Sequence, residues 1–252
     1  MTAESALFSY SLRLADNANV LGHRLCEWCG KAPMLEEDLA LSNLGLDLIG
    51  QARSLYTYAG EIEGQGRSED DLAFLRDAPA FRNVLLAEVP NGDFAVTMLR
   101  HFFFSAYYSP YFVAMCESSD ETLAAVSAKA EREMAYHLRH SAEWVIRLGD
   151  STEESAKRLQ HALKVLWPYT GEMFEKDEIE KQLIETGVAI DPETLRDEWQ
   201  RTVAGVFERA KLQVPEGSWM QTGGRSGVHT EHLGFMLAQM QFLQRTYPGA
   251  QW

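Results

Sequence analysis

Acidic and histidine side chains in the segment EREMAYHLRH, Glu131 to His140, are of the types that bind metal ions on helices. Helical proteins with a carboxylate-bridged di-iron centre place a Glu-x-x-His motif on each of two helices and a single Glu on each of two others. The residue three before His137 is Met134, and the matching place on an earlier helix has Leu48 and Gln51. These four positions therefore resemble a degenerate metal motif, and we predict that they bind no metal.

Two acids stand near the degenerate positions, since Asp47 and Glu133 each lie four residues before Gln51 and His137. Residues four apart share a helix face, so one helix alone does not exclude binding. The other helices argue against it, because the residues between Asp93 and Glu117 include no Asp or Glu. We predict that the chain has no catalytic residue.

The polar residues of these helices have two possible roles. One is a satisfied buried network. In the other, Asp47 and Glu133 face solvent and His137 is a lone core histidine. The sequence does not decide between these two roles. The predicted network comprises Asp16, Asn17, Asp47, Gln51, Glu133 and His137.

The pair Cys26 and Cys29, in CEWC, has the spacing of a redox motif. It falls at the C-terminal end of a helical pattern beside Glu27, where the helix dipole and the charge both disfavour a thiolate. We therefore favour structural thiols over reactive ones.

The loop TGGRSGVHT precedes the last helix and has the residues of a weak anion site. Glycines with an arginine ahead of a helix N-terminus can hold a phosphate or carboxylate, but we favour an irregular loop docked on another part of the protein. The two histidines at its end have i,i+3 spacing and no convergent acid, which makes metal binding there a minor alternative. The residues concerned are Gly223, Gly224, Arg225, Gly227, His229 and His232.

Apolar residues recur at spacings of three and four, which predicts an all-α protein. We expect long helices at about 5–28, 34–63, 93–117 and 121–148, with a long connection over 64–91. Two helical hairpins joined by one long crossover are typical of a ferritin-like four-helix bundle. We predict one domain over residues 1–252, with a core bundle at about 5–149 and a helical extension at about 151–252.

The extension has three signals for helix starts. Ser151 with Glu154 predicts a capping box, Asp191 before Pro192 begins another helix, and the last helix opens near Thr230.

Net charge and apolar patterning exclude several classes of protein. The formal net charge is −14 and no Lys/Arg cluster is present, so we expect no nucleic-acid partner. The N-terminus lacks the pattern of a secretory signal, which predicts a cytoplasmic protein. The apolar run 94–116 contains Arg100 and Pro110, so we interpret it as a buried helix rather than a membrane span.

The third helix is rich in aromatic residues that cannot all face one core. We predict that some of them contact a neighbouring chain. They are Phe102, Phe103, Phe104, Tyr107, Tyr108, Tyr111 and Phe112.

Three long segments carry a resemblance to a known family. They are LRLADNANVLGHRLCEWCGKAPMLEEDLALSNLGLDLIGQAR, EMAYHLRHSAEWVIRLGD and TGGRSGVHTEHLGFMLAQMQFLQRTYPGAQW. They resemble the C-type structural subunits of bacterial ring 1,2-phenylacetyl-CoA epoxidases across nearly the whole length.

The resemblance implies a ferritin-like subunit without iron ligands, in an NADPH- and O2-dependent monooxygenase complex of phenylacetate catabolism. It implies a catalytic A subunit as partner, with the di-iron centre and the CoA ester there, and a reductase subunit with flavin and iron–sulfur centres. No cofactor is expected in this chain, and isolated chains could form a homodimer. Two alternatives remain: an autonomous di-iron oxygenase with atypical ligands, and a CoA-ester-binding role for the Arg225 loop.

Overall fold

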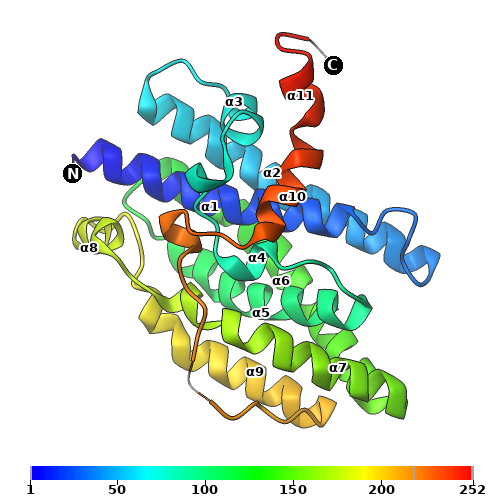
Figure 1. Ribbon diagram of the computed structural model, residues 1–252. Coiled ribbons are helices and arrows are strands. Elements are labelled where there is room, and N and C mark those ends of the chain that lie inside the picture. Colours follow the sequence, from blue (N-terminus) through cyan, green and yellow to red (C-terminus); the bar gives the residue numbers. More distant parts are fainter. Residues whose placement is uncertain (1, 218, 251–252) are drawn as a thin grey trace. The chain divides into compact units, whose positions relative to one another are not determined.

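The computed structural model describes residues 2–217 and 219–250, and this part of the chain contains helices and no strand (Figure 1). The predicted all-α class is confirmed. The chain divides into two compact units, unit 1 being residues 1–90 with 223–252, and unit 2 being residues 91–222. The predicted C-terminal extension therefore contributes to both units, and the single domain stays a prediction. None of the described helices is long and apolar enough to cross a bilayer.

Unit 1 is built on a hairpin of α1 (Ala3–Cys26) and α2 (Leu35–Glu63), which lie side by side (Figure 1). The Thr2 hydroxyl caps α1 by accepting a bond from the Ser5 N–H. Gly64, in the left-handed conformation with φ 65°, ends α2. The two helices approach closely, because a Cβ on Gly22 would lie 3.2 Å from the Gly45 carbonyl oxygen and would be crowded there.

The long connection after α2 contains α3 (Glu69–Phe74) and α4 (Leu85–Glu88), separated by the 3₁₀ turn η1 (Ala78–Ala80). The C-terminal helices of unit 1 are α10 (Glu231–Met240) and α11 (Phe242–Thr246). The predicted start of the last helix near Thr230 is confirmed, because Thr230 is its N-cap.

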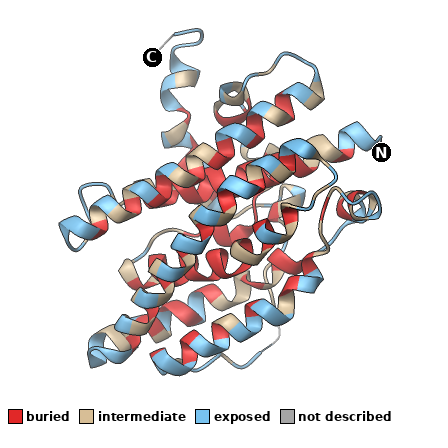
Figure 2. Ribbon diagram, turned by 180° about the vertical axis from the view of Figure 1, so that it is seen from behind, coloured by how far each residue is buried: buried red, intermediate tan, exposed pale blue. Residues whose placement is uncertain are grey.

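Unit 2 contains a second hairpin, α5 (Phe94–Met115) with α6 (Glu121–Asp150). Asp93 and Asp120 cap these helices, each accepting a bond from the backbone N–H three residues later. In α2 and α6 the buried residues form stripes (Figure 2). The α6 stripe includes Leu123 and Ser127, which are buried, whereas Val126 is half-buried.

Three further helices complete unit 2: α7 (Glu153–Leu166), α8 (Glu178–Glu185) and α9 (Arg196–Ala210). The predicted capping box at Ser151 is wrong by one residue. Thr152 caps α7, and its partner in the capping box is Ser155. The Ser155 hydroxyl oxygen accepts a hydrogen bond from the Thr152 N–H at 3.1 Å. The 3₁₀ turn η4 (Pro192–Leu195) follows Asp191 and leads into α9, as predicted.

The aromatic side chains of α5 are buried, and later parts of unit 2 pack on Phe103. Phe103 lies 5.8–6.0 Å, between ring centroids, from Trp167, Trp199 and Phe207, and the Trp199 indole donates to the Phe103 carbonyl. All seven predicted interface residues, Phe102, Phe103, Phe104, Tyr107, Tyr108, Tyr111 and Phe112, are at most 6% exposed. They therefore leave almost no surface for the contact with a neighbouring chain that we predict from the sequence.

Candidate functional site

The degenerate metal positions are occupied by buried residues that are not carboxylates. Leu48 on α2 and Met134 on α6 are fully buried, and Gln51 is 3% exposed. No group of three or more His, Cys, Asp or Glu side chains within residues 2–217 and 219–250 is placed to hold a metal ion. The donor set that these helices provide therefore does not fit a di-iron centre.

Asp16, the acid near the middle of α1, is bound inside unit 1. One carboxylate oxygen accepts from the Tyr56 hydroxyl at 2.6 Å and from the Arg76 guanidinium. The other accepts from Arg76 at 3.2 Å and from the Arg82 N–H at 2.7 Å. Asp16 has no exposed surface, so both oxygens are already used in protein bonds.

The surroundings of Asp16 are buried. The Arg76 guanidinium lies 4.2 Å from the Phe81 ring centroid. Burial, followed by the charge of Asp16, holds the pKa of Tyr56 well above its usual range. Next to Asp16, the Asn17 side-chain oxygen accepts from the Val84 N–H at 2.7 Å. Asp16 and Asn17 therefore attach the connection between α2 and α5 to α1.

His137 on α6 lies beside a second histidine, His101, that the spacing of residues along the sequence did not single out. Its ring centroid is 5.1 Å from that of His101 on α5, and both residues are fully buried. Burial, then the nearby His137, His140 and Arg100, lower the pKa of His101 well below 6.5, so His101 is neutral. The signal for His101 was its place as one of two basic residues in an apolar run. The two imidazoles therefore pack against each other inside unit 2.

The remaining acids of the predicted network have other surroundings. Glu133 lies on α6 with its carboxylate 3.4 Å from the Lys129 ammonium. Asp47 on α2 is half-buried. Asp16, Asn17, Asp47 and Gln51 belong to unit 1, whereas Glu133 and His137 belong to unit 2. A network that joins all six residues stays a prediction.

His229 forms a buried ion pair with Glu88 at the end of α4. Its Nδ1 is 2.7 Å from the carboxylate of Glu88 and its Nε2 is 3.0 Å from the Phe81 carbonyl oxygen. Both neighbours are acceptors, so the site favours a protonated imidazole in which both ring nitrogens donate. Burial alone would lower the pKa of His229, but the bonds to Glu88 and Phe81 and the charge of Glu88 outweigh it, so the pKa is raised.

Glu88 accepts further hydrogen bonds from residues that lie far apart in the sequence of unit 1. The Thr230 N–H and hydroxyl bind one carboxylate oxygen at 2.7 and 2.8 Å, and the Asn83 amide binds the other at 2.9 Å. The Arg24 guanidinium donates to the Glu88 carbonyl at 2.8 Å and to the His232 carbonyl at 3.2 Å. Both ring nitrogens of His229 are therefore used in contacts within the protein, and His232 contributes its carbonyl oxygen. Metal binding by this pair gains no support from these contacts.

The glycine-rich loop is docked on the connection that precedes α5, which is the arrangement that we favoured. A Cβ on Gly224 would lie 2.3 Å from the Asn83 carbonyl oxygen, and a Cβ on Gly227 would lie 2.4 Å from that of Pro79. Only glycine permits these approaches. Gly223 and Gly227 also adopt positive φ, at 126° and 84°. Arg225 is half-buried within this loop.

Cys26 and Cys29 are free thiols. Burial, and then the neighbouring Cys29, raise the pKa of Cys26. This favours the thiol over the thiolate and supports the structural role that we favoured.

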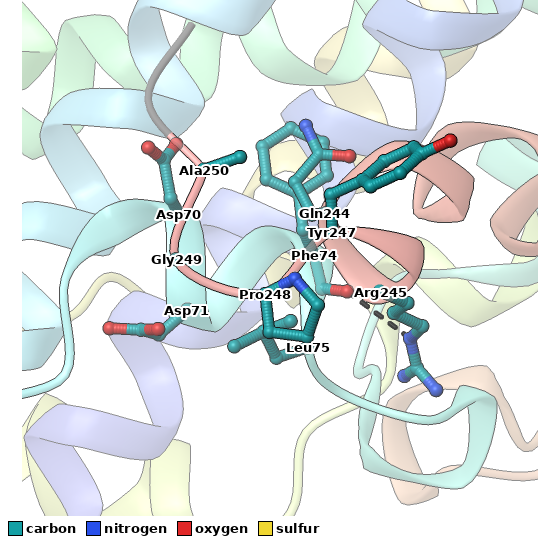
Figure 3. Close-up of a pocket in the computed structure, with 10 residues that line it drawn as sticks. All are labelled: Asp70, Asp71, Phe74, Leu75, Gln244, Arg245, Tyr247, Pro248, Gly249 and Ala250. Atoms are coloured by element: carbon teal, nitrogen blue, oxygen red, sulfur yellow. Dashed lines mark hydrogen bonds between the residues drawn. The ribbon is translucent and has the colours of Figure 1, made fainter.

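A pocket of about 590 Å³ lies in unit 1 between α3 and the C-terminal residues 244–250 (Figure 3). Phe74, Leu75 and Tyr247 supply apolar walls, and Asp70 and Asp71 line it on the α3 side. Its one basic lining residue, Arg245, already donates to the Phe74 and Arg76 carbonyls and to Asp77. The charge of this pocket does not suit an anionic ligand.

Comparisons with known proteins place the chain among proteins of one catabolic pathway. The model of the family described as "Phenylacetic acid catabolic protein" matches residues 1–252. The C subunit of the 1,2-phenylacetyl-CoA epoxidase of Escherichia coli (strain K12) is 52% identical over 246 residues, which are 98% of this chain and 99% of that protein. Both units lie within these matches.

The buried pair of Asp16 and Arg76 gives a first prediction. Asp16→Asn keeps the shape of the side chain but leaves a buried guanidinium without its carboxylate, which should lower the free energy of unfolding by about 3–5 kcal/mol. Urea unfolding followed by circular dichroism measures this. The matched control is Asp77→Asn, which removes the carboxylate from an exposed arginine pair and should change stability little. Equal effects of the two substitutions would contradict this role of Asp16.

The pair of His229 and Glu88 gives a pH-dependent prediction. Because the folded pKa of His229 lies above 6.5, its contribution to stability is complete below pH 6.5 and is lost as the pH rises through the folded pKa. The free energy of unfolding of the wild type minus that of His229→Gln should therefore be largest in mild acid, at about 1.5–3 kcal/mol, and should shrink on going to alkaline pH.

Urea titrations across this pH range provide the measurement. His161→Gln, at an exposed position on α7, serves as the control and should show no such trend. A difference that grows with pH would show that His229 is neutral in the folded protein.

Proposed function

This chain belongs to the phenylacetic acid catabolic protein family, and from this premise we propose that it is a subunit of a phenylacetyl-CoA epoxidase. The relative that is 52% identical over 98% of the chain is named as the C subunit of that enzyme. Identity at this level over both units supports the same place in a complex. A cytoplasmic location goes with the proposal, because CoA thioesters are made and used inside the cell.

We further propose that the subunit is non-catalytic. The observation that carries this proposal is the use of Asp16, whose two oxygens accept four hydrogen bonds from Tyr56, Arg76 and the Arg82 N–H. Leucine and methionine fill the positions where Glu would stand on α2 and α6. A second observation agrees, since α5 presents aromatic residues and a neutral histidine where a bridging carboxylate would be required.

The proposed partner is the catalytic A subunit, with the di-iron centre and the CoA substrate there. Electrons would come from NADPH through a reductase subunit with flavin and iron–sulfur centres. The chain would then contribute a rigid helical surface that keeps the catalytic subunit in its working shape. No catalytic step is assigned to residues of this chain.

The alternative is an autonomous di-iron oxygenase with atypical ligands, drawn from Asp16, Asp47, Glu133 and His137. To bind iron, Asp16 would have to release Arg76, which is 6% exposed, and leave its charge uncompensated. Glu133 would have to leave Lys129. Both requirements disfavour the alternative. The Arg225 loop is likewise a weak candidate for CoA-ester binding, because its backbone packs closely against residues 79–85.

Metal analysis of separated subunits tests the proposal. The chain is purified alone under reducing conditions with ferrous iron supplied, and the cognate catalytic subunit is treated in the same way. This chain should retain far less than one iron per molecule, whereas the catalytic subunit should retain about two. Stoichiometric iron in this chain, lost on His137→Ala without a loss of helical content, would establish the alternative instead.

A further inference from the structure

The outer face of α2 has three leucines that unit 1 does not use in its core. Leu35, Leu39 and Leu46 are 72%, 58% and 62% exposed. Their separations of four and seven residues place them on one face of the helix. The buried residues Leu41, Leu44 and Leu48 occupy the opposite face. We call Leu35, Leu39 and Leu46 the outer leucine stripe.

The spacing of the stripe is that of a helix–helix contact. Positions 35, 39, 42 and 46 alternate in steps of four and three, which is the pattern of positions that meet a second helix along a seam. Ser42 occupies the remaining position and is half-buried. Single exposed leucines are common on protein surfaces, but three in this register on the side away from the core indicate an interaction site.

The charges around the stripe indicate the chemistry of its partner. Outside the core, α2 has the acids Glu36, Asp38 and Asp47 between Leu35 and Ala52, whereas Glu37 is buried. The next residue, Arg53, is basic, but its charge is paired with Glu69 at 3.3 Å. A second copy of the chain would bring the same acids against them, and the net charge of −14 adds to that repulsion. An anionic lipid surface is disfavoured for the same reason. A helix with apolar residues along its seam and Lys or Arg beside them is complementary.

We propose that the outer leucine stripe is the docking seam for an amphipathic, basic-flanked helix of the catalytic subunit. This inference rests on the proposed function and adds the surface and the chemistry of the contact. The leucines supply the apolar contact, and the acids of α2 select a partner with the opposite charge. Because the leucines are exposed in the chain by itself, they can be replaced without opening the core.

The first experiment replaces the stripe with a neutral helix former, Leu35→Gln with Leu39→Gln and Leu46→Gln. Affinity for the purified cognate catalytic subunit is measured by biolayer interferometry, with circular dichroism to verify the fold. We expect the dissociation constant to rise by about 100-fold or more, since apolar anchors dominate such contacts. The matched control replaces exposed apolar residues elsewhere, Val113→Gln with Val214→Gln, and should keep wild-type affinity.

A second experiment tests the charge of the partner at Asn43, an exposed position one turn after Leu39 and three residues before Leu46. Asn43→Lys should weaken binding several-fold, Asn43→Glu should not, and the difference should shrink in high salt. If Asn43→Glu weakened binding more than Asn43→Lys, the partner helix would not be basic and the proposal would be wrong.

The outcomes separate this inference from the proposed function. If the wild type binds the catalytic subunit and the stripe variant binds equally well, the docking seam is wrong and the proposed function stands. If the wild type binds no epoxidase subunit, both fail. If sedimentation equilibrium shows that the chain self-associates and that the stripe variant does not, the occupant is a second copy and the proposal is wrong.

Discussion

The buried carboxylate of Asp16 determines how unit 1 is assembled. A charge with no exposed surface is stable only when it is paired and fully hydrogen-bonded, and its partners come from α2 and from the connection that leads to α5. Arg76 and the Arg82 N–H are thereby held against the middle of α1. The course of that connection is thus set by the need to satisfy a single acid.

The next part of the connection holds the C-terminal residues of the chain. Glu88, also without exposed surface, accepts bonds from His229 and Thr230, while Gly224 and Gly227 allow the backbone to lie against residues 79–85. Residues more than a hundred positions apart in sequence therefore depend on the placement that Asp16 imposes. Acids that could serve chemistry in another protein bind other parts of unit 1 here, which supports our proposal of a non-catalytic subunit.

Local patterns in the sequence predicted most of the helical framework. The four long helices lie within a few residues of the predicted bounds, because apolar spacing and capping residues act over short distances. The burial of His137 and of the apolar run on α5 followed from the same patterns. The cap of α7 was misplaced because Ser151 and Thr152 are both good caps, and the choice between them depends on which hydroxyl reaches the N–H three residues later.

Contacts between residues far apart in the sequence cannot be predicted from these local patterns. Arg76 lies 60 residues from Asp16, and His229 lies 141 residues from Glu88, so no spacing rule links them. The sequence of α5 alone does not show that Trp167, just after α7, and Phe207 on α9 pack on Phe103, so it predicts contact with a neighbouring chain instead. The outer leucine stripe was also missed, since a sequence shows which leucines share a face but not which face is covered.

The central claim is that this chain supports epoxidation without performing it, and an omission assay tests it most directly. The catalytic subunit, the reductase and this chain are purified separately, and formation of the phenylacetyl-CoA epoxide from O2 and NADPH is followed as each is left out. We predict no product from this chain with the reductase alone, and full activity only when the catalytic subunit is joined by this chain. Product formed by this chain and the reductase without the catalytic subunit would contradict the claim.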